Sequence, residues 1–302
     1  MLIVALSTQP AFLMGAAFLQ LEADIGLTPT TLGMLTATFF LTASVSSVPL
    51  GRLVERIGWR RAMRINAGVA AAVLLAIALV GRSVWVLAGL LVVGGIAYGF
   101  ANPAANKALA EKVDPGRRGL IFGLKHAGIP TSTLLAGLAL PILVLTIGWP
   151  AAFAVAALLA PIVWLLIPGE ADTPASIVGV DEPAHGAAPL SVLQLIGLAT
   201  AAALATWSAI SLSTFLVAAA VATDISEGGA GVLLFAGSLT SIAARVLAGA
   251  TNDRYRGRGF AALVVLLGLG AIVFWRCVPR LDHGSSGSCS LRSPPAGGGR
   301  AS

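Results

Sequence analysis

Residues 51–61 read Gly-Arg-Leu-Val-Glu-Arg-Ile-Gly-Trp-Arg-Arg. They separate two apolar runs, residues 31–50 and 65–80. Each run is near the length of about 20 residues that a helix needs to cross a bilayer. Up to Arg64 the segment carries five arginines and one acid, Glu55. A short basic segment between two such runs is typical of a cytoplasmic loop in a multi-pass membrane protein.

The composition of the whole chain agrees with this interpretation. Of 302 residues, 57% are hydrophobic and 11% are charged, whereas a soluble domain carries about 25% charged residues. So few charges exclude an ordinary soluble enzyme and a disordered chain. The net charge of +6 comes mostly from basic residues in short gaps between apolar runs. These residues therefore indicate membrane topology rather than nucleic-acid binding.

Nine apolar runs predict nine membrane spans. Their approximate bounds are 1–19, 31–50, 65–80, 84–106, 119–147, 151–167, 190–221, 231–250 and 260–275. The fifth run is interrupted by Pro130 and Pro141. The chain is thus expected to be an all-α polytopic membrane protein with four parts: a six-span bundle (1–168), a cytoplasmic linker (169–189), about three further spans (190–275) and a low-complexity tail (276–302).

The distribution of Lys and Arg predicts the orientation. The segments after the second, fourth and eighth runs carry five, four and three basic residues, and those after the first, fifth and seventh carry none. By the positive-inside rule the first set is cytoplasmic, and so is the N-terminus. We expect a plasma (inner) membrane location. The four arginines of the tail would lie outside, against this rule.

A second segment resembles the first. Residues 249–258 read Gly-Ala-Thr-Asn-Asp-Arg-Tyr-Arg-Gly-Arg and follow the eighth run. Both segments have Gly, three residues, an acid, Arg, and then Gly and further basic residues. The repeat falls at a spacing of six spans, as expected of two parallel halves. The matching residues are Gly51, Glu55, Arg56, Gly58, Arg60 and Arg61, and Gly249, Asp253, Arg254, Gly257 and Arg258.

At these residues the sequence resembles the major facilitator superfamily, whose motif between spans 2 and 3 has the form G-x-x-x-D-R-x-G-R-R. Here Glu55 replaces the usual Asp, and Trp59 stands where Arg is common. The resemblance implies two six-helix bundles around a central cavity, with alternating access. It also implies that the motif helps to hold the bundles together on the cytoplasmic side. A loop that only anchors the topology is the alternative.

The sequence departs from the family in the number of spans. Twelve are expected in the family, whereas nine are predicted here, and the ninth leads into the Gly-, Ser- and Pro-rich tail. We therefore expect an incomplete C-terminal bundle and a chain truncated after about nine spans.

Ionisable side chains inside spans are costly and often functional. Here they are Lys125, His126 and Arg245, and no Asp or Glu lies well inside a run. A hairpin between the fourth and fifth spans would bring Asn102 and Asn106 to the depth of Lys125 and His126. These four residues are the predicted substrate-binding cluster, with Lys125 attracting an anion and His126 as its proton-sensitive partner. In the alternative, Lys125 extends to the interface and His126 makes a bond between helices. Arg245 is expected to extend to the interface or to pair with Asp253.

The predicted function is secondary active transport of a small solute, with the positive cluster favouring an organic anion. No enzyme activity, cofactor, metal or nucleic acid is expected; the partners are the solute, a coupling ion and the bilayer. One alternative is a multidrug efflux carrier. Such carriers in the family often have Arg four residues before a Gly of span 4, but Leu90 precedes Gly94 here. The other alternative is a non-transporting fragment of a disrupted transporter gene.

Overall fold

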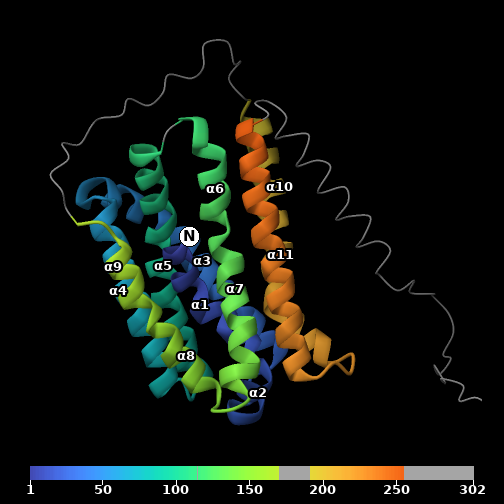
Figure 1. Cartoon of the computed structure of the whole chain (residues 1–302). Coiled ribbons are helices and arrows are strands. Elements are labelled where there is room, and N and C mark those ends of the chain that lie inside the picture. Colours follow the sequence, from blue (N-terminus) through green and yellow to red (C-terminus); the bar gives the residue numbers. More distant parts are fainter. Residues whose placement is uncertain (114, 170–190, 255–302) are drawn as a thin grey trace, which may run out of the picture. The chain divides into compact units, whose positions relative to one another are not determined.

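The computed structural model describes residues 1–113, 115–169 and 191–254, and every regular element in these ranges is helical. The predicted linker beyond residue 169, the ninth span, the tail, Gly257 and Arg258 lie outside the described residues. Figure 1 shows the helices running side by side as one bundle. The elements are α1 (Leu2–Ala16), α2 (Phe18–Ile25), α3 (Pro29–Ile57), α4 (Trp59–Val80), α5 (Val84–Lys112), η1 (Pro115–Arg117), α6 (Arg118–His126), α7 (Gly128–Ala139), the π-helical turn η2 (Leu140–Val144), α8 (Trp149–Ala157), α9 (Leu159–Leu166), α10 (Val192–Val221) and α11 (Glu227–Arg254).

The predicted spans two to eight correspond to seven helices or helix combinations that are long and apolar enough to cross a membrane. The first span differs from the straight helix that the apolar run suggested. It consists of α1 and α2, which are bent by 67° at a short break and count together as an eighth candidate. The described residues therefore form an all-α, multi-pass membrane protein.

The charged segments that we predicted as loops are mostly helical. Helix α3 continues to Ile57, and Gly58 alone separates it from α4. Helices α5 and α11 likewise continue to Lys112 and Arg254. Hydropathy detects the apolar part of a helix, whereas the backbone keeps its hydrogen bonds into the polar ends. The turn occurs at Gly58 because its φ of +82° lies in the left-handed region that glycine tolerates.

The fifth span is broken where its prolines predicted an interruption. The chain runs from α6 into α7 through Ala127 and then into the π-helical turn η2, which contains Pro141. Proline has no N–H to donate, so the helix must adjust its hydrogen bonds around it. At η2 the amide of Leu145 donates to the carbonyl of Leu140, five residues back (3.0 Å).

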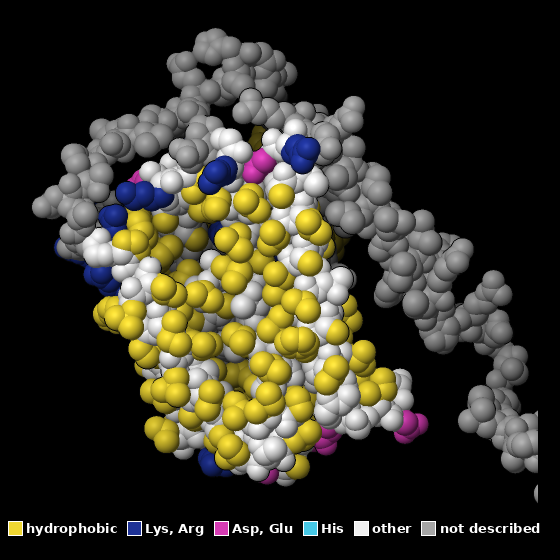
Figure 2. All heavy atoms as spheres, in the orientation of Figure 1, with side chains coloured by type: hydrophobic (Ala, Val, Ile, Leu, Met, Phe, Trp, Pro, Cys, Tyr) yellow, Lys and Arg dark blue, Asp and Glu magenta, His cyan; other side chains and the backbone are white. Residues whose placement is uncertain are grey.

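The outer surface of the bundle is apolar. Leu165 on α9 is 83% exposed, which is expected of a side chain that faces lipid. Figure 2 shows hydrophobic side chains over the middle of the visible face, with Lys and Arg concentrated at one end. That end includes the ends of α3, α5 and α11 and the starts of α4 and α6. The positive-inside rule predicts that Lys and Arg gather on one side of the membrane, as they do here.

Glycines bring α11 into backbone contact with the fifth span. A Cβ atom on Gly249 would collide with the carbonyl oxygen of Gly119 on α6, and one on Gly123 with that of Arg245. Nearer the other end, a Cβ on Gly137 would lie 2.8 Å from the carbonyl oxygen of Gly231. Such small residues allow helices to approach closely in a membrane. The α6–α7 span and α11 are therefore packed against each other along their length.

Candidate functional site

The first copy of the repeated motif joins α3, α4 and α5. The Nζ atom of Lys107 on α5 lies 2.7 Å from a carboxylate oxygen of Glu55 near the end of α3. Gly51, one turn earlier, faces Pro103 of α5, and a Cβ there would lie 3.8 Å from the proline ring. The glycine and the acid of this copy thus both face α5, within the first half of the chain.

Trp59, the departure from the family motif, takes part in the same contact. Its indole Nε1 donates to Glu111 Oε2 on α5 at 2.8 Å. The guanidinium of Arg60 lies over the indole ring, 4.5 Å from its centroid, a distance at which a cation–π attraction operates. Trp59 therefore connects the start of α4 to α5 and also holds a neighbouring arginine.

We expect Trp59→Phe to reduce the stability of the protein by about 1–2 kcal/mol, because phenylalanine cannot donate to Glu111 and its smaller ring fills less of this buried position. The midpoint of thermal unfolding in detergent measures the effect. Trp85→Phe is the control, since the Trp85 side chain is 85% exposed. Equal shifts in the two variants would show that the Glu111 bond contributes nothing.

The second copy of the motif joins the two halves of the chain. Both carboxylate oxygens of Asp253 on α11 accept backbone hydrogen bonds at the start of α6, from the amides of Gly119 and Leu120 (2.7 Å each). The first amides of a helix have no partner within the helix and carry partial positive charge. Asp253 is therefore an N-terminal cap supplied by another helix, and Gly249 allows the close approach that this cap requires. Arg254 ends α11.

The predicted polar cluster is partly assembled. Lys125 Nζ on α6 donates to Asn106 Oδ1 on α5 at 2.6 Å, and the lysine is 8% exposed. Asn102, one turn before Asn106, is exposed and lies beside Tyr98. The residue His126 is exposed as well. The structure thus brings Lys125 and Asn106 together, whereas no hydrogen bond joins Asn102 or the His126 ring to that pair.

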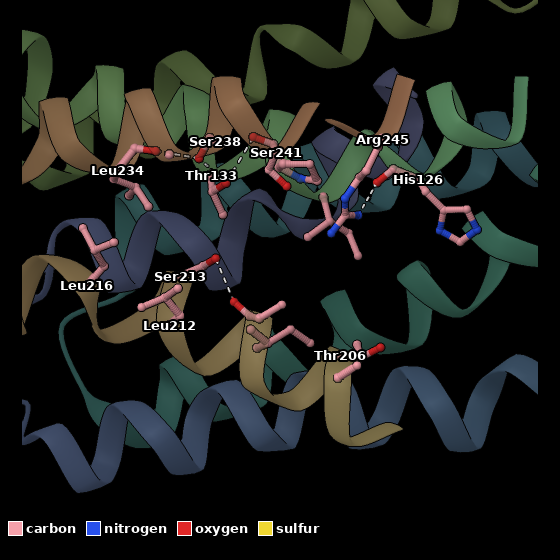
Figure 3. Close-up of a pocket in the computed structure, with 16 residues that line it drawn as sticks. His126, Thr133, Thr206, Leu212, Ser213, Leu216, Leu234, Ser238, Ser241 and Arg245 are labelled. Atoms are coloured by element: carbon pink, nitrogen blue, oxygen red, sulfur yellow. Dashed lines mark hydrogen bonds between the residues drawn. The ribbon is translucent and has the colours of Figure 1, made fainter. Parts of the chain in front are cut away.

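A pocket lies between the fifth span, α10 and α11, with a volume of about 390 Å³. Figure 3 shows its polar side chains on both sides of the hollow, with α11 and α7 opposite α10. Thr133 and Ser238 lie on the same side of the hollow, opposite α10 (Figure 3), and their hydroxyl oxygens are hydrogen-bonded to each other (2.6 Å). The remaining polar residues that line it are His126, Thr206, Ser213, Ser241 and Arg245.

Arg245 has a partner that the sequence interpretation did not foresee. Its Nη1 donates to the backbone oxygen of His126 at 2.7 Å, whereas Asp253 binds the amides of α6. The His126 carbonyl is available because its helical donor would be the amide four residues later, and that residue is Pro130, which has no N–H. Pro130 was the signal in the sequence. It marks an unpaired carbonyl that a donor on another helix can bind.

Metal binding receives no support from these contacts: the described residues contain no group of three or more His, Cys, Asp or Glu side chains that could hold a metal ion.

Apolar helices of membrane-spanning length with charged ends define a multi-pass membrane protein. The model of the Major Facilitator Superfamily matches residues 1–279, and the chain belongs to this family. It is also similar to a protein described as "Probable anion transporter 5" from Arabidopsis thaliana, with 27% identity over 142 residues. The aligned region covers 47% of this chain and 33% of that relative, so the chain spans about a third of the relative's length.

Proposed function

We propose that this protein is a secondary active transporter of a small organic anion and that it works by alternating access between two bundles. The single observation that carries the proposal is the charge inside the membrane. Lys125, His126 and Arg245 all lie within spans, whereas each acidic residue of the described spans lies near the end of a helix. Cations without nearby carboxylates favour an anionic solute over a cationic one.

Lys125 is the residue that we assign to attracting the anion. Its ammonium group has three donors, and Asn106 accepts one of them. Among the described residues no further acceptor binds this ammonium group, so we assign its remaining donors and its charge to a solute that enters beside α5. Asn102 and His126 complete the proposed site, with His126 as the proton-sensitive partner. The relative described as an anion transporter supports this choice of substrate class.

We propose that the two copies of the motif control access to the binding site from the cytoplasm. The Asp253 cap on α6 links the halves at the basic end of the bundle, which we propose is the cytoplasmic side of a plasma (inner) membrane. We propose the same side for the N-terminus; Met1 itself lies within the bundle (Figure 1), where a Cβ on Gly128 would lie 2.9 Å from its carbonyl oxygen. Opening toward the cytoplasm would then require the carboxylate to leave the amides of Gly119 and Leu120. In the first copy, Glu55, Arg56, Gly58, Arg60 and Arg61 are proposed to contribute to the same control.

The test is uptake of radiolabelled small anions into proteoliposomes that contain the purified protein. We expect Lys125→Ala to reduce anion uptake about tenfold, which corresponds to the loss of about 1.4 kcal/mol of interaction. Lys112→Ala is the matched control, because this lysine is exposed at the end of α5. Unchanged anion uptake in Lys125→Ala would contradict the assignment. Export of lipophilic cations would favour the drug-efflux alternative, and absence of any transport would favour the non-transporting fragment.

A further inference from the structure

The pocket beside Arg245 is lined by polar residues on one face of α11 and on one face of α10. Ser238, Ser241 and Arg245 follow one another at spacings of three and four residues on α11, so they lie on one face of that helix. Thr206 and Ser213 are placed in the same way on α10, seven residues apart. The volume of about 390 Å³ is near the lower end of the range of about 300–1,000 Å³ that is typical of small-molecule sites. The pocket therefore fits a small solute.

Within the part of the chain that the structure describes, no carboxylate balances the charge in this pocket. Arg245 lies eight residues before Asp253, which binds the start of α6 at the basic end of the bundle, about 12 Å along the helix axis. A guanidinium has five N–H donors, and within the described part of the chain Arg245 donates to one acceptor, the backbone oxygen of His126. No Asp or Glu is among the described residues that line the pocket. A cation at this depth needs an anionic partner to offset its lost hydration.

Ser241 gives the pocket a second recognition element. It precedes Arg245 by one helical turn, so its hydroxyl and the guanidinium lie on the same side of α11. The hydroxyls of Ser238 and Ser213 bond to protein oxygens, whereas that of Ser241 has no partner among the residues described. It is therefore available to a hydroxyl group on a solute held by Arg245.

We propose that this pocket binds a small hydroxylated monocarboxylate, with Arg245 holding its carboxylate and Ser241 a neighbouring hydroxyl. The proposal rests on the proposed function and names the class of its substrate. A guanidinium matches a carboxylate through two parallel hydrogen bonds. One arginine balances one negative charge, so the dianionic form of phosphate, which predominates at mildly alkaline pH, would leave a charge uncompensated in a site of low polarity.

The test is equilibrium binding to the purified full chain in detergent, with labelled lactate, glycerate and gluconate as monocarboxylates of increasing length. Sorbitol is the uncharged counterpart of gluconate, and inorganic phosphate is the multivalent anion. We expect at least one of the three monocarboxylates to bind, and sorbitol and phosphate to compete at least tenfold less well. If none of the three binds, or if phosphate competes equally, the proposal is wrong.

Substitutions in the pocket test whether Arg245 is responsible for the binding. We expect Arg245→Gln to weaken monocarboxylate binding at least tenfold, Arg245→Lys to weaken it less because the charge remains, and Ser241→Ala to weaken it about threefold. Thr240→Ala is the matched control, since Thr240 is exposed and its hydroxyl bonds to the carbonyl of Ala236 within α11. Size-exclusion profiles and unfolding midpoints verify that each variant is folded. Unchanged affinity in folded Arg245→Gln would overturn the assignment.

Uptake measurements on the same variants separate this inference from the proposed function. Binding that depends on Arg245 without any uptake would support the pocket and contradict transport by this chain. Anion uptake that depends on Lys125 but is unchanged in Arg245→Gln would support transport and overturn the role of Arg245.

Discussion

Replacing Gly249 with alanine is expected to lower the stability of the protein by about 3 kcal/mol. The added Cβ would collide with the carbonyl oxygen of Gly119 and lie 3.1 Å from the Cα of Leu120. The three nearest atoms are all backbone atoms, so rotation of a side chain cannot relieve the collision and α11 must move from α6. That movement also pulls Asp253 from the amides that it caps, which adds to the loss.

The measurement is the midpoint of thermal unfolding in detergent, together with the fraction of protein that elutes as a single species. Gly237→Ala is the matched control on the same helix, because a Cβ there meets nothing within 4 Å. Alanine is favoured over glycine in a helix by about 1 kcal/mol, so the control should be as stable as the parent or more so. If Gly249→Ala and Gly237→Ala have the same unfolding midpoint, α6 and α11 are not in close backbone contact.

Asp253→Ala is expected to cost about 2–3 kcal/mol. The substitution removes two hydrogen bonds from a charged acceptor and leaves the amides of Gly119 and Leu120 without a partner at a helix start. Exchange of these two amides with deuterium should become faster in the variant, because the first turn of α6 loses its cap. Hydrogen-exchange mass spectrometry of peptides that cover residues 118–126 measures this effect, and thermal unfolding measures the cost.

Two further variants make the Asp253 result specific. Asp253→Asn keeps one acceptor oxygen and should lose about half as much stability as the alanine variant. Glu22→Gln removes a charge from an exposed position on α2 and should change neither the exchange of α6 nor the unfolding midpoint. An Asp253→Ala protein with the same protection of α6 as the parent would rule out the cap.

The sequence was sufficient to predict that these helices cross a membrane, and insufficient to place their ends. The runs that became α3 and α5 are recognised by their hydropathy, which depends on composition alone. Their continuation to Ile57 and Lys112 depends on backbone hydrogen bonds that polar side chains neither reveal nor prevent. The bend between α1 and α2 likewise occurs within a continuous apolar run, where hydropathy has no signal.

In the candidate site, too, the sequence was sufficient to predict some contacts and insufficient for others. Lys125 and Asn106 were predicted to meet because a short connection forces neighbouring spans into a hairpin. The bond from Arg245 to His126 joins residues 119 positions apart, and its prediction required knowing that α11 packs on the fifth span. The Asp253 cap required the same knowledge. Local patterns identify which side chains are unusual, whereas the packing of distant spans decides which of them become partners.

The contact between α6 and α11 also has a mechanical consequence. Helices usually interlock through ridges of side chains, which fit only at certain offsets and resist sliding. At Gly123 and Gly249 the nearest atoms across the contact are backbone atoms, so interlocking side chains contribute little to the offset of the two helices there. The offset is instead held by polar bonds: Asp253 accepts from the amides of Gly119 and Leu120, and Arg245 donates to the carbonyl of His126. Sliding of α11 along α6 therefore requires these few bonds to break, rather than many side chains to repack.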